Sequence, residues 1–140
     1  MAAMSNFLES GLLNHFFRTS AYTRPTQIAI GLTTNPPSDS DPGTTSKEVG
    51  DGIGYTRQLI AQDNANWTNP TLAGLIENVN AVSFGPASAD WGMVSGVVIL
   101  DNNGHGSGNI LFHGTLSVAR DVRSGDTFNF AAGEIDITFA

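Results

Sequence analysis

Residues 87–114 read ASADWGMVSGVVILDNNGHGSGNILFHG, and this stretch decides the fold class. Two apolar runs, 94–100 and 109–112, flank a tip that is rich in Asp, Asn and Gly. Because these three residue types accept the backbone angles of tight turns, the pattern predicts a β-hairpin. Leu116 and Val118 continue its second arm. We expect the remaining strands to pair with this hairpin or to pack over it.

Short segments with the period-two alternation of strands occur on both sides of the hairpin. Phe128 and Phe130 are expected on one side of the predicted strand 127–131. Ile135, Ile137 and Phe139 are expected on one side of the predicted strand 134–139. Such alternation is typical of strands that place one face on a core. The predicted strands outside the hairpin are 27–32, 55–62, 75–84, 127–131 and 134–139. Their number and spacing predict an all-β fold, an antiparallel β-sandwich or jelly roll, in a single domain over residues 1–140.

The segment 5–18, SNFLESGLLNHFFR, predicts one short N-terminal α-helix. Leu8, Leu12 and Phe16 recur every four residues and therefore share one face of a helix. Phe7, Leu13 and Phe17 widen that face, and Ser5 or Asn6 is a suitable N-cap. Two interpretations remain open. The helix either packs over an open end of the domain or serves as a docking arm.

The segment 33–54 carries three of the six prolines and four of the 16 glycines. A stretch of this length without regular structure is usually functional or an exposed excursion, so we expect an extended loop or contact arm. Asp39, Asp41 and Asp51 lie within it, but their spacing lacks the alternating ligands and closing Glu of a calcium loop. No metal site is therefore predicted there.

Charge and hydropathy argue against several classes of partner. The net charge is −7, and the six basic residues are scattered, whereas nucleic-acid binding needs clustered Lys and Arg. No apolar run approaches the roughly 20 residues that cross a bilayer. The start of the chain lacks the features of a signal peptide, so we expect synthesis in the cytoplasm. Neither a nucleic acid nor a membrane is an expected partner.

Catalytic and cofactor chemistry is not predicted anywhere in the chain. His15, His105 and His113 lack the pairwise spacing that brings metal ligands together locally, and each is interpreted as structural. The glycine-rich tip around His105 lacks the Lys-Ser/Thr pair and the following helix of a phosphate-binding loop. The run from Asp101 begins like a calcium loop but has Phe112 where a closing Glu belongs. The sequence therefore predicts no enzyme, no cofactor and no metal.

Tryptophan leaves one alternative open. Trp67 and Trp91 are able to stack on sugars, as in a carbohydrate-binding jelly roll, although packing in a core or interface is the commoner role.

Several stretches read together resemble a family of small virion proteins of tailed bacteriophages, often labelled cement, decoration or tail-fibre-like proteins. The stretches are SNFLESGLLNHFFRTSAYTRPTQIAIGLTTNPP (5–37), YTRQLI (55–60), VSFGPASADWG (82–92), LFHGTLSVARDV (111–122) and GDTFNFAAGEIDITFA (125–140). They follow the family's order over nearly the whole chain.

The resemblance implies a structural protein with a β-sandwich or jelly-roll body. It implies most directly a cement protein on the outer capsid surface, which bridges subunits of the major capsid protein and forms a dimer or trimer at a symmetry axis. The rival is a tail-fibre component, which would normally have a repetitive or coiled shaft, and no heptads or repeats are present here. The expected assembly interface comprises Phe7, Leu8, Leu12, Phe16, Phe17, Pro36 and Pro37.

Overall fold

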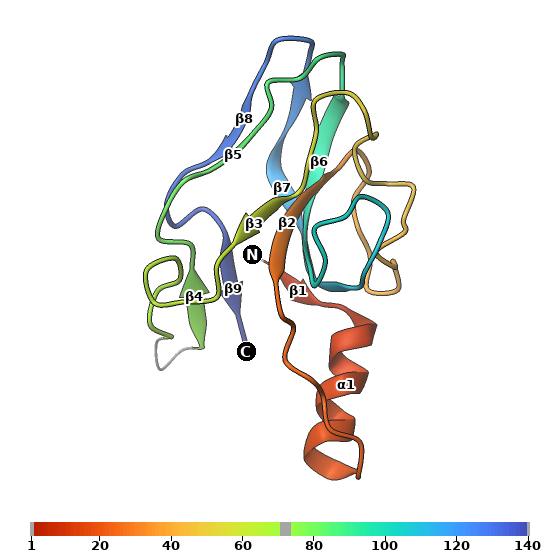
Figure 1. Cartoon of the computed structure of the whole chain (residues 1–140), viewed down its shortest axis with the longest axis vertical. Coiled ribbons are helices and arrows are strands. Elements are labelled where there is room, and N and C mark those ends of the chain that lie inside the picture. Colours follow the sequence, from red (N-terminus) through yellow and green to blue (C-terminus); the bar gives the residue numbers. More distant parts are fainter. Residues whose placement is uncertain (1, 71–73, 140) are drawn as a thin grey trace.

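The computed structural model describes residues 2–70 and 74–139, and these form a two-layered β-sandwich with one projecting helix (Figure 1). Within these ranges the elements, in chain order, are β1 Ala3–Met4, α1 Asn6–Phe17, β2 Ile28–Thr33, β3 Gln58–Ile60, β4 Leu75–Glu77, β5 Val82–Phe84, β6 Gly92–Leu100, β7 Ile110–Val122, β8 Phe128–Phe130 and β9 Asp136–Thr138. The all-β prediction with a short N-terminal helix is confirmed.

The predicted hairpin is the centre of the larger layer. Strands β6 and β7 pair antiparallel from Gly92 opposite Val122 to Leu100 opposite Ile110, with register shifts between Val94 and Gly96 and between Ile99 and Leu100. Around this pair the first sheet has the order β1-β7-β6-β2-β3. The sequence did not predict β1, whose two residues pair with β7.

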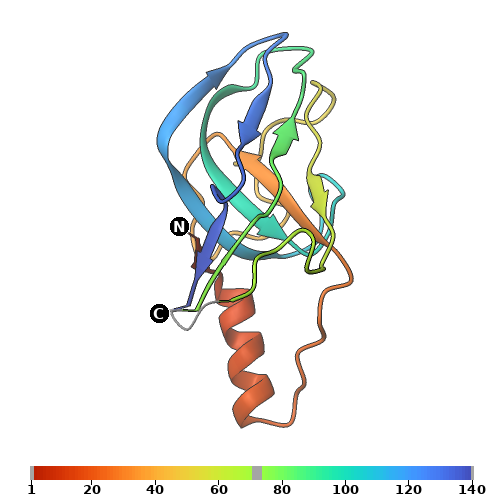
Figure 2. The same ribbon diagram turned by 90° about the vertical axis from the view of Figure 1, so that its left-hand side faces the viewer.

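The second layer consists of two short strand pairs, β4 with β9 and β5 with β8 (Figure 2). The predicted alternation places Phe128 and Phe130 in the core, where both rings meet Phe84 edge-on. Ile135 and Ile137 are also buried as predicted, whereas Phe139, which was expected on the same face, is 52% exposed at the end of the described chain. Apolar side chains of both layers thus form one shared core.

The prediction of a single strand over 75–84 is wrong. The chain forms β4 and β5 there, and they pair with different partners. Asn78 causes the break, because its buried side chain donates to the carbonyl oxygens of Asn80 (2.7 Å) and Ala131 (3.1 Å) and accepts from the Ile135 amide (2.9 Å). These bonds turn the chain from one strand pair to the other.

The predicted strand 55–62 is regular only over β3. The alternation of a regular strand places Tyr55, Arg57, Leu59 and Ala61 on one face, but Tyr55 and Arg57 are buried while Leu59 is exposed. Tyr55 donates from its hydroxyl to Glu48 and accepts from the Leu32 amide, both at 2.9 Å. Buried polar partners, which the local pattern does not reveal, thus shorten this strand.

The segment 33–54 lies beside the tip of the β6–β7 hairpin (Figure 1). Its later part is held against the body, since Glu48 and Val49 are buried and the Val49 amide donates to the Leu32 carbonyl at 3.0 Å. Gly43 contacts the hairpin tip, where a Cβ added to it would lie 2.1 Å from the carbonyl oxygen of Gly108.

The base of α1 is fastened to the sheet. Ser5 caps the helix by accepting from the Leu8 amide at 3.2 Å, and its hydroxyl donates to the Ile110 carbonyl at 2.5 Å. The Ser5 amide donates to Leu111, and the Asn6 amide donates to the carbonyl of Asp39. From this base the helix projects away from the sandwich in both views (Figures 1 and 2).

Candidate functional site: a projecting helix and an apolar pocket

Burial along α1 depends on distance from the base. Leu8, in the first turn, is 5% exposed, and Leu12 is half-buried. Phe16 and Phe17, in the last turn, are 71% and 81% exposed, and Phe7 and Leu13 are also exposed. The shared face of Leu8, Leu12 and Phe16 therefore does not pack along the body, because the helix leaves the body after its first turns.

The returning chain supports the helix. The amide of Tyr22 donates to Nδ1 of His15 at 3.1 Å, and the ring of Tyr22 meets the ring of Phe7 edge-on. A Cβ at Gly11 would lie 2.8 Å from the Tyr22 ring, so the absence of a side chain allows this contact. Partial burial, and then the negative charge of Asp101, raise the pKa of Tyr22. The helix is therefore held in place on one side.

Pro36 and Pro37 lie apart from the phenylalanines of the helix tip. Pro36 is exposed, whereas Pro37 packs over Gly96 in β6. Asp39, two residues later, bonds to the helix base, while Phe17 ends the helix. The structure thus places the predicted interface residues in two separate regions.

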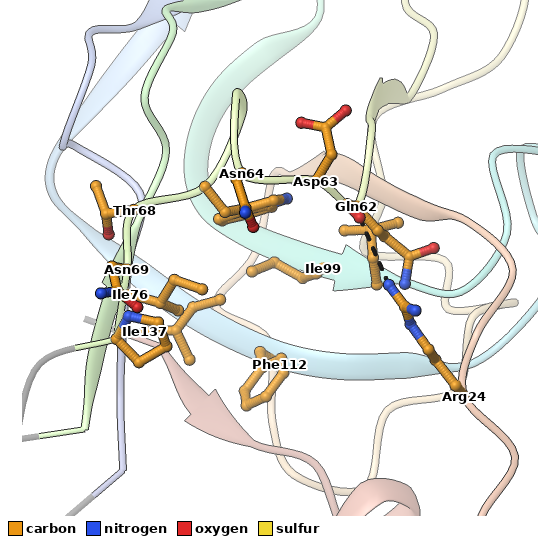
Figure 3. A pocket seen from close by; sticks show the side chains of 13 residues that line it. Arg24, Gln62, Asp63, Asn64, Thr68, Asn69, Ile76, Ile99, Phe112 and Ile137 are labelled. Atoms are coloured by element: carbon orange, nitrogen blue, oxygen red, sulfur yellow. Dashed lines mark hydrogen bonds between the residues drawn. The ribbon is translucent and has the colours of Figure 1, made fainter.

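Between the two layers, an apolar pocket of about 620 Å³ opens beside the segment 61–70 (Figure 3). Apolar side chains from both layers line it, namely Ile28, Trp67, Ile76, Ile99, Phe112 and Ile137. Polar residues, namely Arg24, Gln62, Asp63, Asn64, Thr68 and Asn69, also line it. The pocket therefore combines an apolar floor with hydrogen-bonding groups, the usual composition of a binding site.

Part of the polar lining is held by the protein itself. Arg24 donates to the Gln62 carbonyl at 3.5 Å, and one carboxylate oxygen of Asp63 accepts from the amides of Ala65 and Asn66 at 3.0 Å. The side chains of Asn64 and Asn69 and the indole N–H of Trp67 make no hydrogen bond to the described residues. These groups remain available to a bound molecule.

Sequence reasoning did not identify this pocket. The alternation in 134–139 correctly placed Ile137 on the inner face. Residues on the inner face were expected to pack in a closed core, however, and not to line a pocket. The pocket exists because inward residues of β4 and β9 do not close against β6 and β7 at this edge, and no local pattern reports such a gap.

Each of the three histidines has a contact within the fold. Besides the bond of His15 to Tyr22, Nε2 of His105 lies 2.7 Å from the Val49 carbonyl oxygen. Nε2 of His113 lies 2.7 Å from Oδ1 of Asp39. Among the residues that the structure describes, no three His, Asp or Glu side chains gather as they would around a metal ion.

The remaining candidates are part of turns or of the core. Both carboxylate oxygens of Asp101 bond to Asn109, at 2.7 and 2.9 Å, and so close the hairpin tip. Trp91 is buried, with its indole N–H donating to the Ile53 carbonyl at 2.8 Å. Of the two tryptophans considered for sugar stacking, only Trp67 lines the pocket.

Over the described parts of the chain, no helix is long and apolar enough to cross a membrane.

Comparison with known proteins identifies the family. No curated protein matches the chain. A family model, Gp80, described as podophage GP4 fiber I protein gp80, matches residues 3–138. This match covers nearly the whole sequence and supports the resemblance to phage virion proteins, although it does not specify capsid cement. The chain therefore belongs to the Gp80 family, a family of structural proteins of the phage virion.

Proposed function

We propose that the protein is a component of a tail fibre and that it assembles through α1. The observation that carries this proposal is the match of residues 3–138 to a family described as a fibre protein. The resemblance seen in the sequence placed capsid cement first and a tail fibre second. The family's description supports the fibre role at least as well.

The geometry supports an assembly role. A helix fixed at its base and exposed at its tip presents Phe16 and Phe17 to solvent, and large exposed apolar groups mark interaction surfaces. Helix α1 is therefore the proposed assembly element, with Phe7, Leu12, Phe16 and Phe17 as its contact residues. Pro36 and Pro37 form a second, separate contact in this proposal.

Cementing of the capsid is the second candidate, and one observation favours it. The described residues form a sandwich and a 12-residue helix, without a fibre shaft. In this candidate the outer surface of the head is the location, and the major capsid protein is the partner. Copies of the chain would form a dimer or trimer at a symmetry axis.

In both candidates we propose a structural role without enzymatic activity and without a nucleic acid or membrane as partner. The hydrogen bonds of the histidines to Tyr22, Val49 and Asp39 support this view, because each ring is already part of the fold.

Copy number and location on the particle test the proposal. Purified particles are separated into heads and tails, and the protein is quantified in each by mass spectrometry against the major capsid protein. Tens of copies per particle in the tail fraction are expected for a fibre. Hundreds of copies in the head fraction would replace the fibre role with cementing, and absence from intact particles would overturn both.

A further inference from the structure

We propose that the tip of α1, formed by Phe16 and Phe17, inserts into the apolar pocket of a second copy of the chain. This inference rests on the proposed assembly role and names the partner and the receiving site.

The helix does not reach the pocket of its own chain. Its 12 residues rise about 18 Å from a base that Ser5 and Asp39 fix to the body. The tip points away from the sandwich in both ribbon views (Figures 1 and 2), whereas the pocket is lined by residues of both layers (Figure 3). An intact helix is thus able to fill only the pocket of another molecule.

The pocket suits aromatic side chains. Its floor of four isoleucines, Phe112 and Trp67 offers dispersion contacts and edge-on ring packing to an inserted phenylalanine. Its volume of about 620 Å³ lies within the roughly 300–1,000 Å³ of pockets that enclose organic ligands. The site therefore has the chemistry and the size to take two rings.

The exposed area of the helix is appropriate for a weak contact between copies. Because a Phe side chain buries about 150–250 Å², Phe16 and Phe17, which are 71% and 81% exposed, together offer roughly 300 Å² to the pocket. A standard interface buries about 800 Å² per partner. The two rings thus supply over a third of that area, and the exposed Leu13 beside them and the pocket rim are available for the remainder.

Charge also fits this arrangement. Arg18 follows directly after Phe17, and Asp63 lies beside the pocket. Neither residue has an ion-pair partner within the described parts of the chain. An inserted tip brings Arg18 close to the Asp63 carboxylate, while Arg24, which donates to the Gln62 carbonyl, lines the same pocket.

The contact is head-to-tail, because one copy supplies the helix and the next supplies the pocket. Every copy retains one free tip and one free pocket, and such interfaces produce rings or extended rows. This distinguishes the proposal from helix–helix pairing, which uses the same surface on both copies and stops at a dimer.

Sedimentation of the purified full chain over a range of concentrations tests the proposal. The tip variant Phe16→Ser/Phe17→Ser and the pocket variant Asn64→Trp/Asn69→Trp change exposed positions, so both should fold. Each is expected to weaken self-association at least tenfold. The control Val118→Ser removes an apolar side chain that is equally exposed, at 71%, on β7, and it should associate like the wild type.

Mixing the two variants tests the head-to-tail arrangement. The tip variant retains a working pocket and the pocket variant retains a working tip, so the mixture should form a one-to-one complex that grows no further. Self-association of the pocket variant at wild-type strength would overturn the proposal in favour of helix–helix pairing. A monomeric wild type at millimolar concentration would also overturn it. The fibre role is tested separately, by the location of the protein on the particle. The failure of one proposal therefore does not imply the failure of the other.

Discussion

Arg57 and Glu48 form a buried pair with two parallel hydrogen bonds, Nε to Oε1 at 2.7 Å and Nη2 to Oε2 at 2.8 Å. The guanidinium also donates to the carbonyl oxygens of Gly43 (3.0 Å), Asn102 (2.8 Å) and Ser107 (2.8 Å). One side chain thereby joins the segment 33–54, the strand region around β3 and the tip of the β6–β7 hairpin.

Substitution Arg57→Ala should destabilise the protein by about 3–5 kcal/mol, because it leaves Glu48 buried without a partner. Urea unfolding followed by tryptophan fluorescence measures the loss. The matched control is Arg123→Ala, which breaks an exposed pair with Asp121 and should cost at most about 1 kcal/mol. Equal losses for the two variants would contradict the role given to Arg57.

Acid should weaken the segment 33–54 through Asp41. Burial alone would raise the pKa of this carboxyl, but hydrogen bonds from Lys47 and Ser38 outweigh burial and lower the pKa below its ordinary value. A lowered pKa stabilises the fold above the unfolded value of about 3.9, and this contribution disappears as the pH falls through the folded value.

The wild type should therefore lose more stability than Asp41→Asn between pH 6 and pH 3, by up to about 1 kcal/mol, since the pair with Lys47 is partly exposed. Urea midpoints at the two pH values measure this difference. Lys47→Met should reduce the pH dependence in the same direction. Identical pH profiles for wild type and Asp41→Asn would exclude this contribution.

Contact between Gly43 and the hairpin tip predicts a selective effect of an added methyl group. Gly43→Ala brings a Cβ against the Gly108 carbonyl, a backbone group that is not free to rotate away, and should destabilise by about 1–3 kcal/mol. Gly50→Ala is the control in the same segment, because its Cβ would meet only Ile53, at 3.5 Å. Thermal unfolding should separate the two variants clearly, and coincident curves would rule out the close approach.

The buried hydrogen bonds of the Asn78 side chain should stabilise the fold, and a substitution that removes them tests this. Asn78→Ala leaves the buried Ile135 amide without its partner and should cost about 1–3 kcal/mol. Asn80→Ala removes two longer, exposed contacts at 3.3 Å and should change the unfolding free energy by less than about 0.5 kcal/mol. Chemical denaturation provides both values, and a neutral Asn78→Ala would show that the break between β4 and β5 has another cause.

Elements with strong local patterns were predictable from the sequence. The hairpin around residues 94–112 follows from apolar runs on both sides of a turn, and the helix follows from its N-cap and four-residue spacing. In β8 and β9, apolar residues alternate with polar ones, so that Phe128, Phe130 and Ile137 point to the inner face of their strands. In each case the information lies within a few neighbouring residues.

Long-range polar contacts were not predictable. Arg57 turns inward because Glu48 and three carbonyl oxygens surround it, and these partners lie outside its own strand, between 9 and 50 residues away. The helical repeat of Leu8, Leu12 and Phe16 indicates an apolar face but not where the body ends beneath it. The pocket likewise depends on how two layers diverge, which only their packing determines.

The fixed base of α1 has a geometric consequence for any assembly built on its tip. Ser5, Asn6 and Asp39 set the direction of the helix relative to the sheet that carries the pocket floor. The angle between the axis of α1 and the pocket is therefore fixed within each molecule. If copies join tip to pocket, that single angle sets the rotation from one copy to the next, and thus whether a series of them closes on itself or continues as a spiral.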